Sequence, residues 1–267
     1  MYAFDYHRPR TMKEAAALLR KIENARPLAG GQSLVAALKL RLASPAALVD
    51  LGELEELRGI KLDGATLTIG ALTRHSEVAS SKDVAIGIPA LARLADGIGD
   101  RQIRNQGTLG GSLANNDPAA DYPAAALGLG ATITTNRREI PADKFFTGLF
   151  QTALKPGEII VSVSFPLPKR AAYVKFRNPA SRFALVGVFA SESAGIVRIA
   201  VTGGGNGVFR VKSMEKKLSE SFSPEAIAKI KVSPEELSSD VQASAEYRAH
   251  LVTVLAQRAV AAAIAGK

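Results

Sequence analysis

Two glycine-rich segments carry the residues whose types and spacing favour ligand chemistry. The first reads Ala29-Gly30-Gly31-Gln32-Ser33-Leu34 and joins a short apolar run to a helical pattern, and the second covers residues 107–118. Glycine tolerates positive φ and lets backbone N–H groups approach a ligand closely, and such converging N–H groups favour an anion. Each segment therefore suits a phosphate group.

A single Gly-Gly pair between a strand and a helix is commonly just a tight connection. Two such segments in one chain favour a dinucleotide, whose pyrophosphate can be held by backbone donors from both sides. Asp121 follows the second segment and is an acceptor suited to a ribose hydroxyl, the alternative being a solvated or helix-capping carboxylate.

The usual nucleotide-binding fingerprints are missing from the sequence. No strand is followed by G-x-G-x-x-G and no G-x-x-x-x-G-K-[ST] is present, which argues against a Rossmann domain and a P-loop NTPase. A third glycine cluster, residues 203–207, matches neither spacing and is interpreted as a turn or hinge at a strand end.

Composition excludes several classes of protein. The 267 residues carry a net charge of +9, with 34 Lys and Arg against 25 Asp and Glu, but the excess is scattered and only 6% of residues are aromatic, so nucleic-acid binding is not expected. Because the chain has no cysteine, it can form no disulfide and no thiolate metal or iron–sulfur site.

The three histidines, His7, His75 and His250, are isolated in sequence, so no metal site is predicted. The first 19 residues lack the apolar core of a signal peptide, and no run reaches the roughly 20 apolar residues of a membrane span. A cytoplasmic location is therefore expected.

Hydrophobic periodicity predicts alternating helices and strands. Thr11 and Glu14 fit a capping box that opens a helix over residues 12–24, and Asp63-Gly64 favours a hairpin turn within residues 60–72. Residues 105–111 are interpreted as a loop, with a helix starting near Pro118. Pro166 and Pro168 mark the best domain boundary. The other predicted helices are 33–42, 88–98 and 244–265, and the other predicted strands are 27–29, 47–51, 131–140, 158–166, 173–177, 185–191 and 196–203.

The sequences of the two glycine segments, and their order along the chain, resemble those of the FAD-binding medium subunits of the molybdenum hydroxylase family. This family includes xanthine and carbon monoxide dehydrogenases. Other segments are similar along almost the whole chain. They are Phe4-x-Tyr6-x-Arg8-Pro9, Gly70-Ala71-Leu72-Thr73, Asp117-Pro118-Ala119-Ala120-Asp121, Pro156-Gly157-Glu158-Ile159-Ile160 and Tyr247-Arg248.

The resemblance implies an α+β chain with the vanillyl-alcohol-oxidase-type (PCMH-type) FAD-binding fold. The FAD-binding domain would cover residues 1–168, as an N-terminal subdomain (1–55) and a larger one (56–168), both α/β. Residues 169–267 would form a C-terminal domain with a three-stranded sheet and helices.

The resemblance also implies site residues: both loops would wrap the FAD pyrophosphate, Asp121 would bind ribose or ribityl hydroxyls, Ile159 and Ile160 would touch the adenine or ring system, and Lys175 would lie near the isoalloxazine edge. Ser112 stands where many relatives have Asn, and Phe183 near where some have Tyr or Asp. The full expected set is Leu28, Ala29, Gly30, Gly31, Gln32, Ser33, Leu34, Ile103, Gly107, Thr108, Gly110, Gly111, Ser112, Ala114, Asp121, Ile159, Ile160 and Lys175.

The implied function is electron transfer, without an acid–base pair or nucleophile of the chain's own. FAD, bound noncovalently, would pass electrons to NAD, a quinone or dioxygen. They would come from [2Fe-2S] clusters on a small subunit and molybdopterin on a large one, with a dimer of heterotrimers expected. The alternatives are a self-sufficient flavin-dependent oxidase or reductase of the same fold, and a scaffold without flavin.

Overall fold

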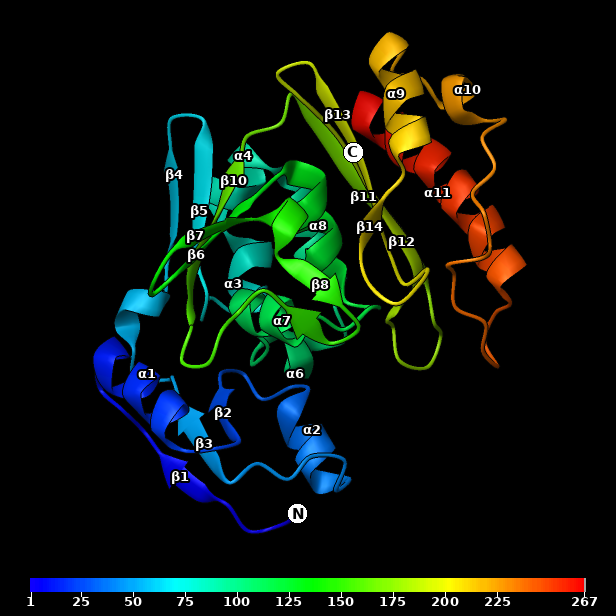
Figure 1. Ribbon diagram of the computed structural model, residues 1–267. Coiled ribbons are helices and arrows are strands. Elements are labelled where there is room, and N and C mark those ends of the chain that lie inside the picture. Colours follow the sequence, from blue (N-terminus) through cyan, green and yellow to red (C-terminus); the bar gives the residue numbers. More distant parts are fainter. Residues whose placement is uncertain (267) are drawn as a thin grey trace.

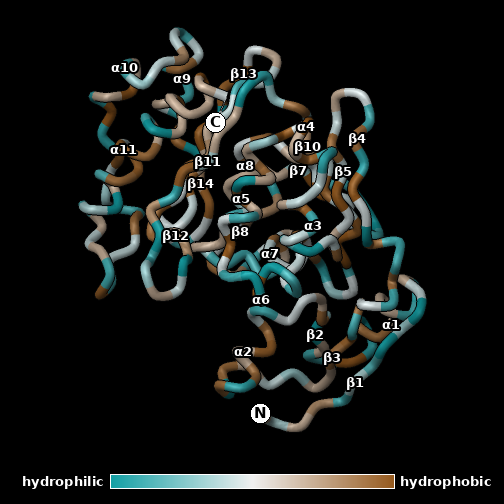
Figure 2. Tube along the Cα trace, turned by 180° about the vertical axis from the view of Figure 1, so that it is seen from behind, coloured by the Kyte–Doolittle hydropathy of each residue, from teal (hydrophilic) through white to brown (hydrophobic). Residues whose placement is uncertain are grey.

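The computed structural model describes residues 1–266. Three units follow one another along the chain, and Figure 1 shows the N-terminal unit beneath the central one, with the C-terminal unit beside it. Figure 2, seen from behind, shows the N-terminal unit at one end and α9–α11 along one edge.

The N-terminal unit is built on a three-stranded parallel sheet of order β1-β3-β2. Its first helix begins where the capping box predicted it, because Thr11 Oγ1 accepts the N–H of Glu14 and the Glu14 carboxylate accepts the N–H of Arg10. Its elements are β1 (Asp5–His7), α1 (Met12–Lys21), β2 (Ala25–Leu28), α2 (Leu34–Lys39), β3 (Ala47–Asp50) and the 3-10 turn η1 (Glu55–Leu57).

The central unit holds a five-stranded antiparallel sheet of order β4-β5-β10-β6-β7. The Asp63-Gly64 hairpin is confirmed, and Gly64 has φ +55°. The elements are β4 (Ile60–Asp63), β5 (Thr66–Gly70), α3 (His75–Ser80), α4 (Lys82–Gly87), α5 (Pro89–Asp96), α6 (Arg101–Arg104), α7 (Leu109–Asn115), α8 (Asp121–Leu129), β6 (Thr132–Thr135), β7 (Glu139–Pro141), η2 (Ala142–Lys144), β8 (Phe146–Gly148), β9 (Gln151–Thr152) and β10 (Ile160–Pro166).

The C-terminal unit begins after Pro166 with an antiparallel sheet of order β11-β12-β13-β14. The prediction of a three-stranded sheet is wrong, because the sheet has a fourth strand: the two-residue β14 pairs with β13 at Ala200 and Val201. The elements are β11 (Arg170–Arg177), β12 (Ala184–Ser193), β13 (Ile196–Thr202), β14 (Phe209–Arg210), α9 (Lys212–Glu220), α10 (Pro224–Ile227) and α11 (Ala245–Ile264).

Helix α8 lies between the central and C-terminal sheets, and all nine of its residues are buried. Phe189 of β12 and Ala200 of β13 belong to the same hydrophobic cluster as α8 and the central sheet. The other face of the C-terminal sheet packs against α9 and α11. The two units therefore share one apolar core.

Two sequence predictions around the second glycine segment are wrong. Residues 105–111 are not all loop, because Thr108 Oγ1 caps α7 by accepting the N–H of Gly111. The next helix starts at Asp121 rather than near Pro118, because residues 117–120 form a turn closed by the Ala120 N–H and the Asp117 carbonyl.

Candidate functional site

The first glycine segment, residues 29–34, connects β2 to α2, and its residues are half-buried or exposed. Gly31 has φ +71°, a conformation that glycine adopts without strain. Within residues 1–266, none of the six backbone N–H groups of residues 29–34 donates a hydrogen bond to a protein acceptor. A run of free backbone donors is an arrangement that suits a phosphate anion.

The second segment is built differently, because the protein itself uses most of its donors. The N–H groups of Gly107, Leu109 and Gly110 bind the carbonyls of Ile103, Thr73 and Ala71 respectively. Those of Gly111 and Ser112 bind the side chain and carbonyl of Thr108. In the described chain, Thr108 is the one residue from 107 to 112 whose backbone N–H has no acceptor.

Glycine lets the two segments touch. A Cβ atom added at Gly30 would lie 1.9 Å from the Gln106 carbonyl oxygen, and one added at Gly111 would lie 3.7 Å from the Ala29 Cβ. A Cβ at Gly110 would lie 2.5 Å from the Ala71 Cβ. The two segments predicted to act together do lie in contact, and Gly30 and Gly110 serve close contacts between protein segments.

Residues 71–75, for which no role was predicted from the sequence, support the second segment through backbone hydrogen bonds. His75 N–H donates to the Gly107 carbonyl, and Arg74 and Thr108 form an isolated antiparallel bridge. Burial and the charge of Arg104 lower the pKa of His75 to about 4, so the ring is neutral at neutral pH. The Gly70–Thr73 similarity was the available signal for this support.

Asp121 and Lys175, predicted separately, form a buried ion pair. Lys175 Nζ lies 2.9 Å and 3.0 Å from the two Asp121 carboxylate oxygens, and Tyr173 donates its hydroxyl to the same carboxylate at 2.5 Å. Burial raises the pKa of Asp121, and Lys175 and Tyr173 act against that rise. This contact joins α8 to β11.

Tyr173 is not among the site residues predicted from the sequence, although a signal for it was present. Residues 173 and 175 lie on one face of β11 because side chains alternate along a strand. Burial and the Asp121 charge raise the pKa of Tyr173 well above its ordinary value. Its hydroxyl therefore stays protonated and keeps donating to Asp121.

The remaining expected residues lie at different depths. Ile159 and Ile160 are both 4% exposed, but Ile159 packs in the core of the N-terminal unit and Ile160 in that of the central unit. Ile103 on α6 and Ala114 on α7 are half-buried, as are Leu28 and Leu34 at the ends of the first segment, whereas Gln32 and Ser33 are exposed.

Within residues 1–266, no group of three His, Cys, Asp or Glu side chains could hold a metal ion. In the same part of the chain, no helix is both long and apolar enough to cross a membrane.

The family model and similar known proteins point to the same family. The family model described as "FAD binding domain in molybdopterin dehydrogenase" matches residues 2–168. The carbon monoxide dehydrogenase medium chain of Hydrogenophaga pseudoflava is 33% identical, covering 97% of this chain and 96% of that protein. The nicotine 6-hydroxylase medium subunit of Paenarthrobacter nicotinovorans is 35% identical, with 97% and 96% covered.

Solved structures agree with the sequence matches. A chain of carbon monoxide dehydrogenase from Hydrogenophaga pseudoflava superposes with a TM-score of 0.89 at 33% identity, covering 99% of this chain and 98% of that one. A chain of quinoline 2-oxidoreductase from Pseudomonas putida 86 also gives 0.89, at 30% identity and the same coverage.

Proposed function

The chain belongs to the family of FAD-binding subunits of molybdopterin dehydrogenases, and from this premise we propose that residues 29–34 supply the main grip on the FAD pyrophosphate. The observation that carries the proposal is the run of six backbone N–H groups for which residues 1–266 provide no acceptor. Thr108 would add its N–H from the second segment. Hydrogen bonds to a charged phosphate contribute roughly 1.5–3 kcal/mol each.

The other residues would orient the two ends of the cofactor. The Asp121 carboxylate has acceptor capacity left beyond Lys175 and Tyr173, because an ionised carboxylate accepts about four hydrogen bonds, and it would take a ribose or ribityl hydroxyl. Lys175 would place positive charge near the isoalloxazine edge. Bound FAD supplies the redox chemistry, and the protein supplies binding and electrostatics.

We propose that electrons reach this chain from partner subunits that carry [2Fe-2S] clusters and molybdopterin, in a dimer of heterotrimers. The chain has no cysteine with which to hold a cluster. Relatives at 33–35% identity are named for carbon monoxide, glyceraldehyde and nicotine, so related subunits occur in enzymes named for chemically unrelated substrates. The acceptor would be NAD, a quinone or dioxygen.

The purified single chain, loaded with FAD, is expected not to oxidise any organic substrate of the complex. The measurement is substrate-dependent bleaching of the flavin absorbance under anaerobic conditions. Dithionite should bleach the same sample, which controls for a flavin that can accept electrons. Bleaching by an organic substrate without partners would instead support a self-sufficient flavoenzyme.

FAD is expected to be held tightly but without a covalent bond. The chain lacks cysteine, and Gln32 in the first segment carries an amide that is not a nucleophile. A covalent bond through His75 is the alternative to test, because its Nε2 would lie 2.5 Å from a Cβ added at Gly107 in the second segment. Acid precipitation should release all flavin absorbance into the supernatant, and flavin retained on the pelleted polypeptide would refute the prediction.

A further inference from the structure

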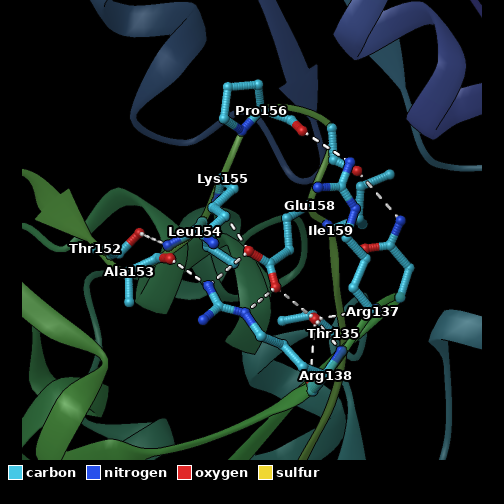
Figure 3. Close-up of polar contacts among 12 residues, drawn as sticks. Thr135, Arg137, Arg138, Thr152, Ala153, Leu154, Lys155, Pro156, Glu158 and Ile159 are labelled. Atoms are coloured by element: carbon cyan, nitrogen blue, oxygen red, sulfur yellow. Dashed lines mark hydrogen bonds and ion pairs between the residues drawn. The ribbon is translucent and has the colours of Figure 1, made fainter.

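Glu158 is a buried carboxylate at the centre of a polar cluster (Figure 3). Its side chain is 0% exposed. It accepts hydrogen bonds from Arg138 Nε at 2.8 Å, Arg138 Nη2 at 3.0 Å, Thr135 Oγ1 at 2.9 Å and the Lys155 N–H at 2.9 Å. The hydrogen bonds from Arg138 hold the pKa of Glu158 down, to about 2. The carboxylate is therefore charged and fully occupied at neutral pH.

The cluster fixes residues 155–159 to the turn between β6 and β7. Asn136 Oδ1 accepts the Ile159 N–H at 3.0 Å, the Asn136 N–H returns a bond to the Ile159 carbonyl at 3.0 Å, and Asn136 Nδ2 donates to the Gly157 carbonyl. Arg137 Nη2 donates to the Pro156 carbonyl (Figure 3). Backbone groups on both sides of Glu158 are thus held.

The opposite face of the same residues lies against the N-terminal unit. Gly157 has φ +69°, and a Cβ there would lie 2.4 Å from Arg20 Cγ and 2.8 Å from the Ala16 carbonyl oxygen on α1. Ile159 packs in the core formed with Ala15 and Ala16, against which Ala29 of the first glycine segment also packs.

We propose that Glu158 is a positioning residue for FAD binding. It holds the N-terminal unit, and with it residues 29–34, in place against the second glycine segment. The inference rests on the proposed function. Glu158 acts through Ile159 and α1: the polar cluster makes residues 155–159 rigid, and this rigid edge fixes where α1 and the loop after β2 lie. Small displacements of preorganised donors weaken binding without unfolding the site.

The test compares Glu158→Gln with Glu215→Gln in the full-length chain. Glu215 is a matched control in the C-terminal unit, because its side chain is 8% exposed, and it binds Arg210 twice and the Ile199 N–H. FAD affinity is measured by recovery of flavin fluorescence on dilution. Glu158→Gln should weaken it roughly tenfold while Glu215→Gln leaves it unchanged.

Hydrogen exchange of the α1 amides provides a readout independent of FAD. Faster exchange in α1 is expected for Glu158→Gln only, and a general loss of stability would affect both variants alike. If Glu158→Gln does not fold, Asn136→Ala, which removes the acceptor of the Ile159 N–H, should give the same pattern.

The outcomes separate the two ideas. If Glu158→Gln binds FAD as tightly as the wild type does, the positioning role is overturned while the proposed function stays intact. The same holds for Asn136→Ala where that variant replaces Glu158→Gln. A wild-type chain that binds no FAD contradicts the proposed function itself.

Discussion

Gly30→Ala is expected to abolish stoichiometric FAD binding. The new Cβ would lie 1.9 Å from the Gln106 carbonyl oxygen and 2.8 Å from the Gly107 Cα, so the two glycine segments must separate. Loss of two hydrogen bonds to phosphate, at roughly 1.5–3 kcal/mol each, lowers affinity at least about a hundredfold. The measurement is the flavin-to-protein absorbance ratio after gel filtration.

Gly207→Ala is the matched control. Gly207 is also a loop glycine without positive φ, and a Cβ there would meet nothing within 4 Å. This variant should keep its full FAD content. A folded Gly30→Ala protein with one FAD per chain would show that the contact between the two loops is not needed for binding.

Arg248→Met is expected to destabilise the C-terminal unit strongly. Arg248 is 4% exposed, and its Nη1 donates to the carbonyls of Leu185 and Gly203 while Nη2 binds Asp240. Methionine fills similar space but leaves two buried carbonyls without a donor, which costs roughly 1–3 kcal/mol each. The free energy of unfolding in urea should fall by about 2–6 kcal/mol.

Arg258→Met on the same helix supplies the comparison. Arg258 is exposed and forms no ion pair or side-chain hydrogen bond among residues 1–266, so its replacement should change stability by less than about 0.5 kcal/mol. Equal urea midpoints for the two variants would contradict the role assigned to Arg248.

Features set by neighbouring residues could be predicted from the sequence. The Thr11 cap and the hairpin at Gly64 are decided within a few positions, and both are present, although Glu14 accepts the N–H of Arg10 rather than that of Thr11 as a full capping box would require. The two glycine segments could also be recognised as a pair. What local pattern cannot show is how the segments differ: five N–H groups in residues 107–112 have acceptors, some of them on residues 71 and 73.

Pairings between distant residues were the part that sequence could not supply. Asp121 and Lys175 were predicted individually, but their ion pair joins residues 54 apart in sequence and depends on how β11 packs beside α8. The glycines at 110 and 111 favoured a loop by propensity, whereas packing against Ala71 and the Thr108 cap place them in a helix. Tertiary contacts override weak local preferences.

The burial of α8 between two sheets has a consequence for cooperativity. A fragment ending at residue 168 would lose Phe189 and Ala200 from the core that surrounds this helix and would expose the α8 surface they cover to water. We therefore expect that residues 1–168 do not fold as an independent unit, and that the central and C-terminal units unfold in a single transition. We expect that a chain without residues 169–267 would lose the FAD site in addition to the C-terminal unit.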